Sequence, residues 1–337
     1  MDRRTFLKRI ASAGVVLPCL LPSIFVRYSE ALDIRRFSFA HVCDLHLDVN
    51  GKSTWQHREK SVLLFIDALR QIGRLSRFDF ILFGGDQIHA GSGDEESLKV
   101  FQEWISQISV PVRILLGNTE VSPDPGVSRL DKDAYLRAWR GRGPAPGKAS
   151  WAFDPVPGVR FIGFDVTVEG RPEGEADSRR IAWLEAELRR SRNYRLVIIA
   201  THQLIYPTTP LDLSPEWSLW MVRNHEEVRE LISRFPNVKL VISGHHHASA
   251  VRTSGGVIYV SDPAVVTYPC AFRVYTVTRE GIALKNIGLG ERAAVSRARD
   301  LLIADPYARI YDPVDPHSVA SYSIGLTEQD REAVIPL

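Results

Sequence analysis

Five short apolar runs of this chain each end in a polar residue of a type that binds metal ions. The clearest run, residues 78–83, leads directly into Gly84-Gly85-Asp86. Glycines at such a point allow a sharp turn and leave room for ions beside the carboxylate. One such turn is weak support, because many strands end in a glycine and an acid. Five of them constrain the fold more strongly, since they predict a sheet whose strand ends gather polar side chains at one edge.

The segments between these runs have the spacing of amphipathic helices. Between residues 59 and 75, apolar side chains recur every three or four positions and form one apolar face. Further helices are expected at 95–108, 130–139, 179–190, 226–235 and 292–304. Strands are expected at 37–43, 78–83, 112–116, 150–153, 160–165, 196–201 and 239–243, with antiparallel strands that close the sheet at 257–260, 272–277 and 282–285. The alternation predicts an α/β fold with parallel strands and crossover helices.

The polar residues at the ends of the runs form a candidate metal site. They comprise four imidazoles, two carboxylates and one amide, namely Asp44, His46, Asp86, Asn118, His202, His245 and His247. Mixed nitrogen and oxygen donors without a thiolate suit Fe, Mn, Zn or Co, and they suit calcium badly because calcium prefers oxygen. Seven ligands exceed one tetrahedral ion but fit two ions that share a carboxylate. Taken alone, a residue such as His202 could equally be a core histidine.

The order and types of these motifs resemble the calcineurin-like metallophosphoesterase family over about residues 37–287. The family pattern is D-x-H, then GD, then GN-H-D/E, then a lone His after a strand, then G-H-x-H. The corresponding stretches of this chain are Asp44-x-His46, Gly85-Asp86, Gly117-Asn118-Thr119-Glu120, Thr201-His202 and Gly244-His245-x-His247.

The resemblance implies a fold, a metal centre and a reaction. The fold would be a four-layer α/β/β/α sandwich of two mixed sheets, with the metals at the strand ends. One metal would take Asp44, His46, Asp86 and His247, and the other would take Asp86, Asn118, His202 and His245, with Asp86 bridging. A hydroxide held between the ions would attack phosphorus in line. The chain is similar to small bacterial cyclic-nucleotide or nucleotide phosphodiesterases, since no second substrate-binding domain is visible.

One position departs from the family pattern. The family usually has a histidine after the Gly-Asn pair, where it assists the leaving group, and this chain has Thr119. A threonine cannot carry a proton near neutral pH, and loss of a general acid typically costs about 10²–10⁴-fold in rate. His89 could take over the acid role, or it could be a supporting or surface histidine. We expect Asp86, Asn118 and His89 to be the catalytic residues.

Three functions stay open. The preferred one is a phosphodiesterase in which the metals supply most of the stabilisation of the transition state. A phosphomonoesterase would use the same ligands. The third is a metal-binding protein with little or no turnover, in which Thr119 marks the loss of activity.

The first 31 residues have the pattern of an export signal. Arg3-Arg4-Thr5-Phe6-Leu7-Lys8 precedes an apolar stretch at 10–25 that two prolines interrupt, and Ala31 is a small residue suited to cleavage. The stretch is too short and broken for a membrane span, which needs about 20 apolar residues. The pattern resembles the twin-arginine signal, which the twin-arginine export machinery recognises. We therefore expect a periplasmic or otherwise exported protein without a stable membrane span in its mature chain.

The charge of the remaining chain bears on its partners. The first 31 residues hold five Lys/Arg and two Asp/Glu, against 42 and 40 in the whole chain, so the rest is close to neutral. A nucleic-acid partner is disfavoured, because it requires a basic surface, and the expected substrate is a small phosphoester. The expected organisation is a signal at 1–31, a phosphoesterase domain at 34–290 and a C-terminal extension at 291–337. We expect the end of that extension to be extended over the surface or partly irregular.

Other conspicuous residues are expected to be structural. Cys43 and Cys270 are expected to be packed thiols rather than partners in a disulfide. His246, within the run of three histidines, is expected to point away from the metals. The patch from Trp217 to Trp220 is expected to pack beneath a proline-rich loop rather than to line a substrate rim.

Overall fold

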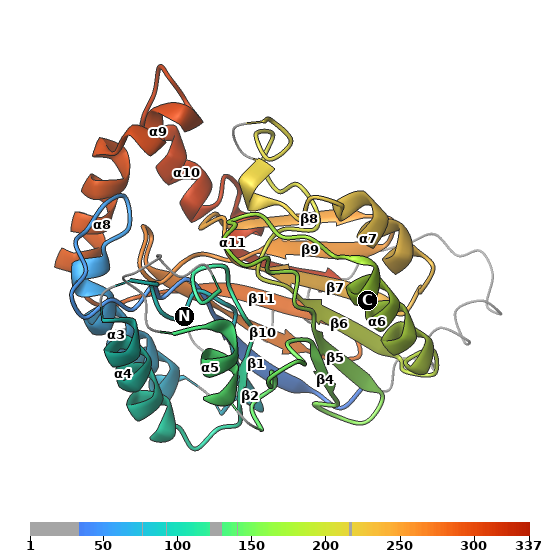
Figure 1. The fold of residues 1–337 in the computed structure, drawn as a ribbon. Helices are drawn as coiled ribbons and strands as arrows, with labels where there is room; N and C mark the ends of the chain where they lie inside the picture. Colours follow the sequence, from blue (N-terminus) through green and yellow to red (C-terminus); the bar gives the residue numbers. More distant parts are fainter. Residues whose placement is uncertain (1–33, 76, 92, 122–129, 140, 216–217) are drawn as a thin grey trace.

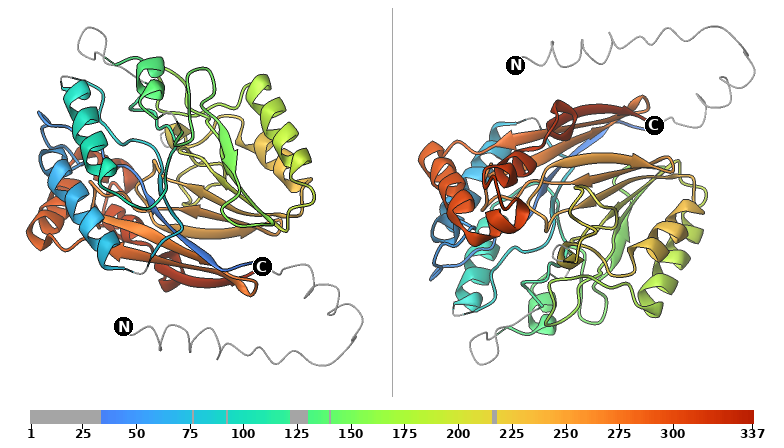
Figure 2. Two further views of the ribbon diagram at one scale, coloured as in Figure 1. Left: turned by 90° about the horizontal axis from the view of Figure 1, so that it is seen from below. Right: turned by 90° about the horizontal axis from the view of Figure 1, so that it is seen from above.

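The computed structural model describes residues 34–75, 77–91, 93–121, 130–139, 141–215 and 218–337, so the expected signal at 1–31 lies outside the described residues. Within those ranges, two six-stranded sheets pack face to face, and helices cover both outer faces (Figures 1 and 2). This arrangement confirms the α/β/β/α sandwich of two mixed sheets.

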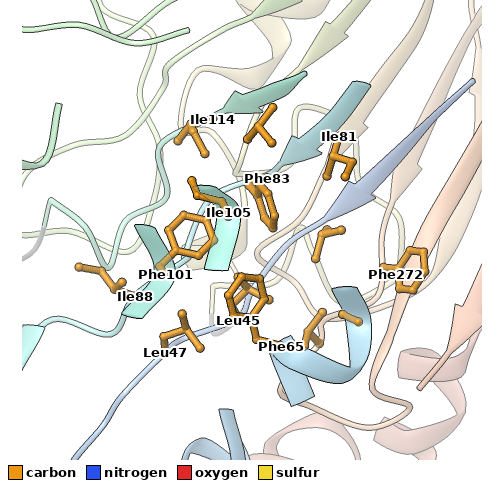
Figure 3. Close-up of a cluster of buried hydrophobic side chains, with 14 of the residues drawn as sticks. Leu45, Leu47, Phe65, Ile81, Phe83, Ile88, Phe101, Ile105, Ile114 and Phe272 are labelled. Carbon is orange, nitrogen blue, oxygen red and sulfur yellow. The ribbon is translucent and has the colours of Figure 1, made fainter. Parts of the chain in front are cut away.

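The first sheet has the strand order β12-β11-β10-β1-β2-β3. Its strands are β1 (Phe37–Val42), β2 (Phe80–Phe83), β3 (Val112–Ile114), β10 (Ala271–Val277), β11 (Gly281–Gly288) and β12 (Glu332–Pro336). Strands β1, β2 and β3 are parallel, and β10, β11 and β12 extend the sheet with antiparallel pairs. The apolar faces of α3 (Ser61–Arg74) and α4 (Asp94–Ser106) pack on the outer side of this sheet, where Phe65 and Phe101 meet Phe83 (Figure 3).

The second sheet has the strand order β4-β5-β6-β7-β9-β8. Its strands are β4 (Trp151–Phe153), β5 (Val159–Gly163), β6 (Leu196–Ala200), β7 (Val238–Ser243), β8 (Ala250–Ser254) and β9 (Val257–Ser261). Helices α6 (Ser178–Arg190) and α7 (His225–Ser233) pack on its outer side. The shorter elements are η1 (Arg58–Lys60), α5 (Lys132–Arg137) and η2 (Ser218–Trp220).

Aromatic side chains hold the two sheets together. Phe39 of β1 stacks on Phe80 and Tyr275, with ring centroids 4.8 Å and 4.7 Å away. Its edge meets Phe161 of β5 in the second sheet at 5.5 Å. These rings are fully buried, and packed aromatic pairs add about 0.5–1.5 kcal/mol each beyond their buried area. The contact therefore fixes the spacing between the two sheets.

The pairing of β9 differs from the prediction. We expected an antiparallel strand at 257–260, but β9 pairs parallel to β7. The unpredicted strand β8 explains the difference, because it reverses the chain before β9 and pairs antiparallel to it. Gly255 and Gly256 form the two-residue turn between them, with φ of 58° and 78°. Such a turn needs positive φ at both positions, and Gly-Gly supplies it without strain.

The end of the chain is mostly helical, which agrees with the helix expected at 292–304 and corrects the expectation of an extended or partly irregular end. It forms the helices α8 (Arg292–Ala304), α9 (Pro306–Tyr311), α10 (Ser318–Ile324) and α11 (Glu328–Arg331), followed by β12. The prolines suggested an irregular tail, but Pro306 occupies the first turn of α9, where a missing N–H costs nothing. No helix in the described ranges combines the length and the apolar character needed to cross a bilayer.

Asp330 fastens this C-terminal segment to the second sheet. Its Oδ2 accepts hydrogen bonds from the N–H and the hydroxyl of Thr327. The Asp330 N–H in turn donates to the Thr327 hydroxyl oxygen, which completes a capping box at the start of α11. Its Oδ1 accepts from the N–H of Val251 at 2.9 Å and from Arg252 at 2.6 Å, both in β8. Burial raises the pKa of Asp330, but these donors outweigh it and leave the pKa below its ordinary value.

Asp330→Asn should therefore destabilise the protein by about 2 kcal/mol at pH 7. Its amide N–H₂ would face N–H or O–H donors at the position where a carboxylate oxygen now accepts their hydrogen bonds. Since the folded-state pKa is lowered, the carboxylate stabilises the protein above the ordinary aspartate pKa, about 3.9, and this contribution is lost as the pH falls below that value. Denaturant unfolding at pH 7 and pH 3.5 measures the difference. Glu328→Gln, on the exposed side of the same helix, is the control. An equal loss at both pH values would contradict the prediction.

Candidate metal centre

The seven predicted ligands lie at the ends of five strands that belong to both sheets. Asp44 and His46 follow β1, Asp86 follows β2 and Asn118 follows β3, so the first sheet supplies four of them. His202 follows β6, and His245 and His247 follow β7, so the second sheet supplies three. The strands that carry them are parallel within each sheet, which places all these ends at one edge of the sandwich.

The side chains converge in two groups. Asp44, His46 and His247 form one group, and within it the potential ligand atoms lie no more than 4.8 Å apart. Asp86, His202 and His245 form the second group by the same measure. All six side chains are buried. Asn118 is half-buried, and its Oδ1 lies 3.2 Å from His202 Nε2, so it adjoins the second group.

Asp86 connects the two groups. Its Oδ2 lies 3.4 Å from His46 Nε2 in the first group. Its Oδ1 lies 3.3 Å from His202 Nε2 in the second group. One carboxylate thus presents one oxygen to each group, which is the arrangement needed to bridge two ions. The division of the other ligands between the groups matches the division implied by the family resemblance.

The backbone is strained at five of these residues. Asp44, His46, Asp86, His245 and His247 have positive φ values between 40° and 64°. A residue other than glycine rarely adopts this left-handed conformation, and each instance costs on the order of 1–3 kcal/mol. Strain concentrated at successive strand ends indicates that the turns are shaped to aim these side chains inward.

The glycines beside them are needed for close approach. A Cβ atom added to Gly85 would collide with the ring of His202, and one added to Gly117 would collide with the carboxylate of Asp86. The glycines singled out in the sequence therefore make room for ligand side chains, as the pattern predicted.

Hydrogen bonds on the far side of the imidazoles select which nitrogen faces inward. His202 Nδ1 lies 2.9 Å from the carbonyl of Gly84, and His247 Nδ1 lies 2.7 Å from the Thr267 hydroxyl. In both rings Nε2 is then left to bind a metal. His245 Nε2 instead lies 3.2 Å from the carbonyl of Leu219, which leaves Nδ1 for the metal. Such partners fix the orientation and the tautomer of histidine ligands.

The electrostatics of the groups favour ionised carboxylates. Burial raises the pKa of Asp86, but the charges of His202 and His46 outweigh it and hold the pKa well below its ordinary value. Burial lowers the pKa of His46 and of His245 to about 3, so both rings are neutral at pH 7. Burial also lowers the pKa of His202, but Asp86 outweighs it and raises the value to about 9. A metal ion would displace the proton of that ring.

Two residues of the Gly-Asn motif support Asp86 rather than face a substrate. The Glu120 carboxylate accepts hydrogen bonds from the backbone N–H of Asp86, Gly117 and Ile88, which ties the β2 and β3 turns together. Burial, followed by the charge of Asp86, raises the pKa of Glu120 to about 8. Thr119 donates its N–H to Asp86 Oδ1 and its hydroxyl to the Ile88 carbonyl. The Thr119 hydroxyl is therefore engaged with the backbone.

Three further residues lie beside the centre, and of these only Trp220 was singled out in the sequence. Gln56 is buried, and its amide nitrogen lies 3.1 Å from His46 Nε2. The ring of Trp55 lies 4.8 Å from that of His247, and the ring of Trp220 lies 4.9 Å from that of His245. The patch that contains Trp220 thus contacts a predicted ligand, while Trp217 lies outside the described residues. No periodic pattern marks these positions in the sequence.

The other singled-out residues have the following surroundings. His246 is buried with Nδ1 3.2 Å from Asp212, so it points away from both groups, as predicted. His89 is half-buried, with its ring 5.7 Å from that of His46, and its role as an acid stays a prediction. Cys43 and Cys270 are free buried thiols, as predicted.

The residues present fit a pair of metal ions. The two groups contain buried carboxylates, imidazole nitrogens that face inward and, beside the second group, an amide oxygen. The carboxylate of Asp86 contacts both groups directly. His46 Nε2 and His247 Nε2 lie 3.4 Å apart, and each lies within 3.4 Å of a carboxylate oxygen, of Asp86 and Asp44 respectively, so nitrogen and oxygen donors gather around one volume. A nitrogen and oxygen donor set of this kind suits first-row transition metals.

Comparison with known proteins shows which family the chain is similar to. The model of a family described as calcineurin-like phosphoesterase matches residues 37–249, more than half of the chain. A probable cyclic nucleotide phosphodiesterase of Synechococcus is 23% identical over 69% of this chain and 82% of its own length. The 3′,5′-cyclic adenosine monophosphate phosphodiesterase of Escherichia coli K12 is 25% identical over 66% of this chain and 70% of its own length.

Two further comparisons concern a second type of diesterase and the fold. A probable glycerophosphodiester phosphodiesterase of Arcobacter nitrofigilis is 21% identical over 61% of this chain and 70% of its own length. The crystal structure of a dimetal phosphatase from Danio rerio has a TM-score of 0.60 and 20% identity, and covers 75% of this chain and 96% of that one. The structural match supports the fold.

Asp86→Ala should release both metal ions, because it removes the one carboxylate that contacts both groups. Metal analysis of the purified protein is expected to find two ions per chain in the wild type and almost none in this variant. His46→Ala removes a ligand of the first group only and should leave the second group loaded. Asp133→Ala, an exposed aspartate of α5, is the control. Retention of two ions by Asp86→Ala would contradict the bridging role.

Proposed function

Because this chain belongs to the calcineurin-like phosphoesterase family, whose members are hydrolases of phosphoric esters, we propose that it cleaves phosphodiesters of the cyclic-nucleotide or nucleotide-like class. The observation that carries the proposal is the position of Asp86, with one oxygen toward each group of ligands. A site with a single ion would leave the buried imidazoles of the second group with no metal to bind.

The two groups would hold the metals as follows. Asp44, His46 and His247 would hold one ion, Asn118, His202 and His245 would hold the other, and Asp86 would hold both. A pair of ions supplies a nucleophilic water at neutral pH and neutralises the charge that builds on the phosphoryl oxygens. The ligand chemistry favours Fe, Mn or Zn.

Other residues of this protein hold the metal ligands in position. Gly84, Leu219 and Thr267 keep three imidazoles in one orientation through their hydrogen bonds. Thr119 and Glu120 hold Asp86 and its turn in place. A site preorganised in this way needs little rearrangement when charge develops in the transition state.

The choice of diester over monoester rests on the relatives. The curated relatives described above are named as phosphodiesterases of cyclic nucleotides or of glycerophosphodiesters.

Thr119 donates its hydroxyl to a backbone carbonyl, so it does not supply a proton to a leaving group. His89, 5.7 Å ring to ring from His46, is the candidate for that role. We expect His89→Asn to slow the cleavage of alkyl esters more than that of nitrophenyl esters, because nitrophenolate departs without a proton.

The proposal includes export. The pattern Arg3-Arg4-Thr5-Phe6-Leu7-Lys8 resembles a twin-arginine signal, which would direct the protein to the periplasm and leave residues 34–290 as the phosphoesterase domain with a C-terminal extension at 291–337. If so, changing both Arg3 and Arg4 to Lys should keep the full-length protein in the cytoplasm. Cell fractionation of wild type and variant measures this, and equal distribution would contradict it.

The metal-loaded protein should hydrolyse bis(p-nitrophenyl) phosphate faster than p-nitrophenyl phosphate. Both substrates release the same chromophore, so the comparison isolates the second ester group from the chemistry of the leaving group. Initial rates with Mn, Fe and Zn measure the preference, and Asp86→Ala is the inactive control. Equal or faster cleavage of the monoester would make the protein a phosphomonoesterase. No turnover of either ester would favour a metal-binding role, and activity that appears only in Thr119→His would identify the reason.

A further inference from the structure

We propose that Gln56 is a catalytic residue whose amide donates a hydrogen bond to a phosphoryl oxygen of the substrate. This inference rests on the proposed phosphoesterase function and concerns the group of Asp44, His46 and His247. Gln56 lies on the loop between β1 and η1, and only 7% of its surface is exposed. A buried amide at this depth must have polar partners, because an unpaired one costs about 1–3 kcal/mol.

The amide of Gln56 points at the position that a metal ion would take. Its nitrogen lies 3.1 Å from His46 Nε2. His46 Nε2 in turn lies 3.4 Å from both His247 Nε2 and Asp86 Oδ2. These atoms converge on one volume. Since an amide N–H₂ can only donate, His46 Nε2 presents its lone pair to Gln56. That lone pair is the one His46 would give to a metal.

Metal binding would therefore free the donor. Once His46 Nε2 coordinates an ion, its lone pair no longer accepts the hydrogen bond from Gln56. The amide N–H would then be able to donate to a phosphoryl oxygen of a bound ester. Among the residues of the Gly-Asn motif, Thr119 cannot serve, because its hydroxyl already donates to Ile88.

The loop that carries Gln56 is held rigidly enough for this role. The carbonyl of Gln56 accepts hydrogen bonds from the N–H of Thr54 and of Arg58, both at 3.0 Å. The neighbouring Trp55 stacks on Tyr307 of α9, with centroids 4.5 Å apart and planes 8° apart. The other neighbour, His57, donates its N–H to the Val266 carbonyl at 2.9 Å. Contacts on both sides of Gln56 thus limit the freedom of its backbone.

The chemical step leaves Gln56 unchanged. In the hydrolysis, a water oxygen forms a bond to phosphorus and the bond from phosphorus to one ester oxygen breaks. One water hydrogen stays on the new phosphoryl oxygen, and the other reaches the departing alcohol. Gln56 transfers no proton. It stabilises the negative charge that grows on a phosphoryl oxygen, as a preorganised neutral donor does.

The test uses full-length, metal-loaded protein with Gln56→Ala and Gln56→Glu. In Gln56→Ala, the dissociation constant of inorganic phosphate, measured by calorimetry, should rise about 10-fold, the effect of one hydrogen bond to a charged acceptor. With bis(p-nitrophenyl) phosphate, kcat should fall by about 100-fold, the size of losing one such donor. Gln56→Glu should weaken phosphate binding further, because it places a carboxylate against the anion. The metal content of both variants should match the wild type.

Lys52→Arg changes an exposed side chain of the same loop while keeping its charge, and it should leave metal content, phosphate affinity and rate unchanged. Loss of metal from Gln56→Ala would overturn the proposal, because it would make Gln56 a metal ligand or a support of His46. Unchanged phosphate affinity in a fully loaded variant would also overturn it. If the wild type cleaves no phosphoester, the proposed function fails. The phosphate titration still tests whether the Gln56 amide contacts a bound phosphate.

Discussion

The carboxylate of Asp86, within 3.4 Å of imidazoles from two separate groups, sets the requirements for the rest of the protein. Those imidazoles come from both sheets, since His46 follows β1 whereas His202 follows β6. Each group combines side chains from both sheets, so its geometry depends on the distance between the two sheets at one edge of the sandwich. Phe39, wedged between Phe80, Tyr275 and Phe161, fixes that distance from within the core. Packing far from the site thus determines whether one carboxylate can reach both groups.

The site is costly for the fold, and the neighbouring residues offset that cost. Five predicted ligands have left-handed backbone conformations, and two carboxylates are buried among histidines. Glu120 satisfies three backbone N–H groups in the turns after β2 and β3, so these strained turns keep their hydrogen bonds. Glycines such as Gly85 and Gly117 remove the side chains that would block close approach. Such local strain persists only where the surroundings overdetermine the conformation.

Structural features that local sequence patterns encode could be predicted. Apolar runs, helical periodicity and the polar residues at strand ends are local features, so the strands, most helices and all seven convergent side chains could be predicted. Gln56 and Trp55 lie in a loop without periodicity, and their contacts with His46 and His247 exist only in the folded chain. The direction of β9 depended on β8, whose Gly-Gly turn was a usable signal. The helix at 292–304 was predicted, whereas the helices after α8 were missed because prolines at helix starts resemble prolines in irregular tails.

The strand β12 has a consequence for aggregation. It contains residues 332–336 and pairs with β11 at one side of the sheet that also contains β1. β11 is an inner strand of this sheet only while β12 covers it. A variant in which β12 detaches would expose β11 as a bare edge strand, and bare edges recruit other chains. Loss of β12 should thus appear first as inclusion bodies rather than as a slow enzyme.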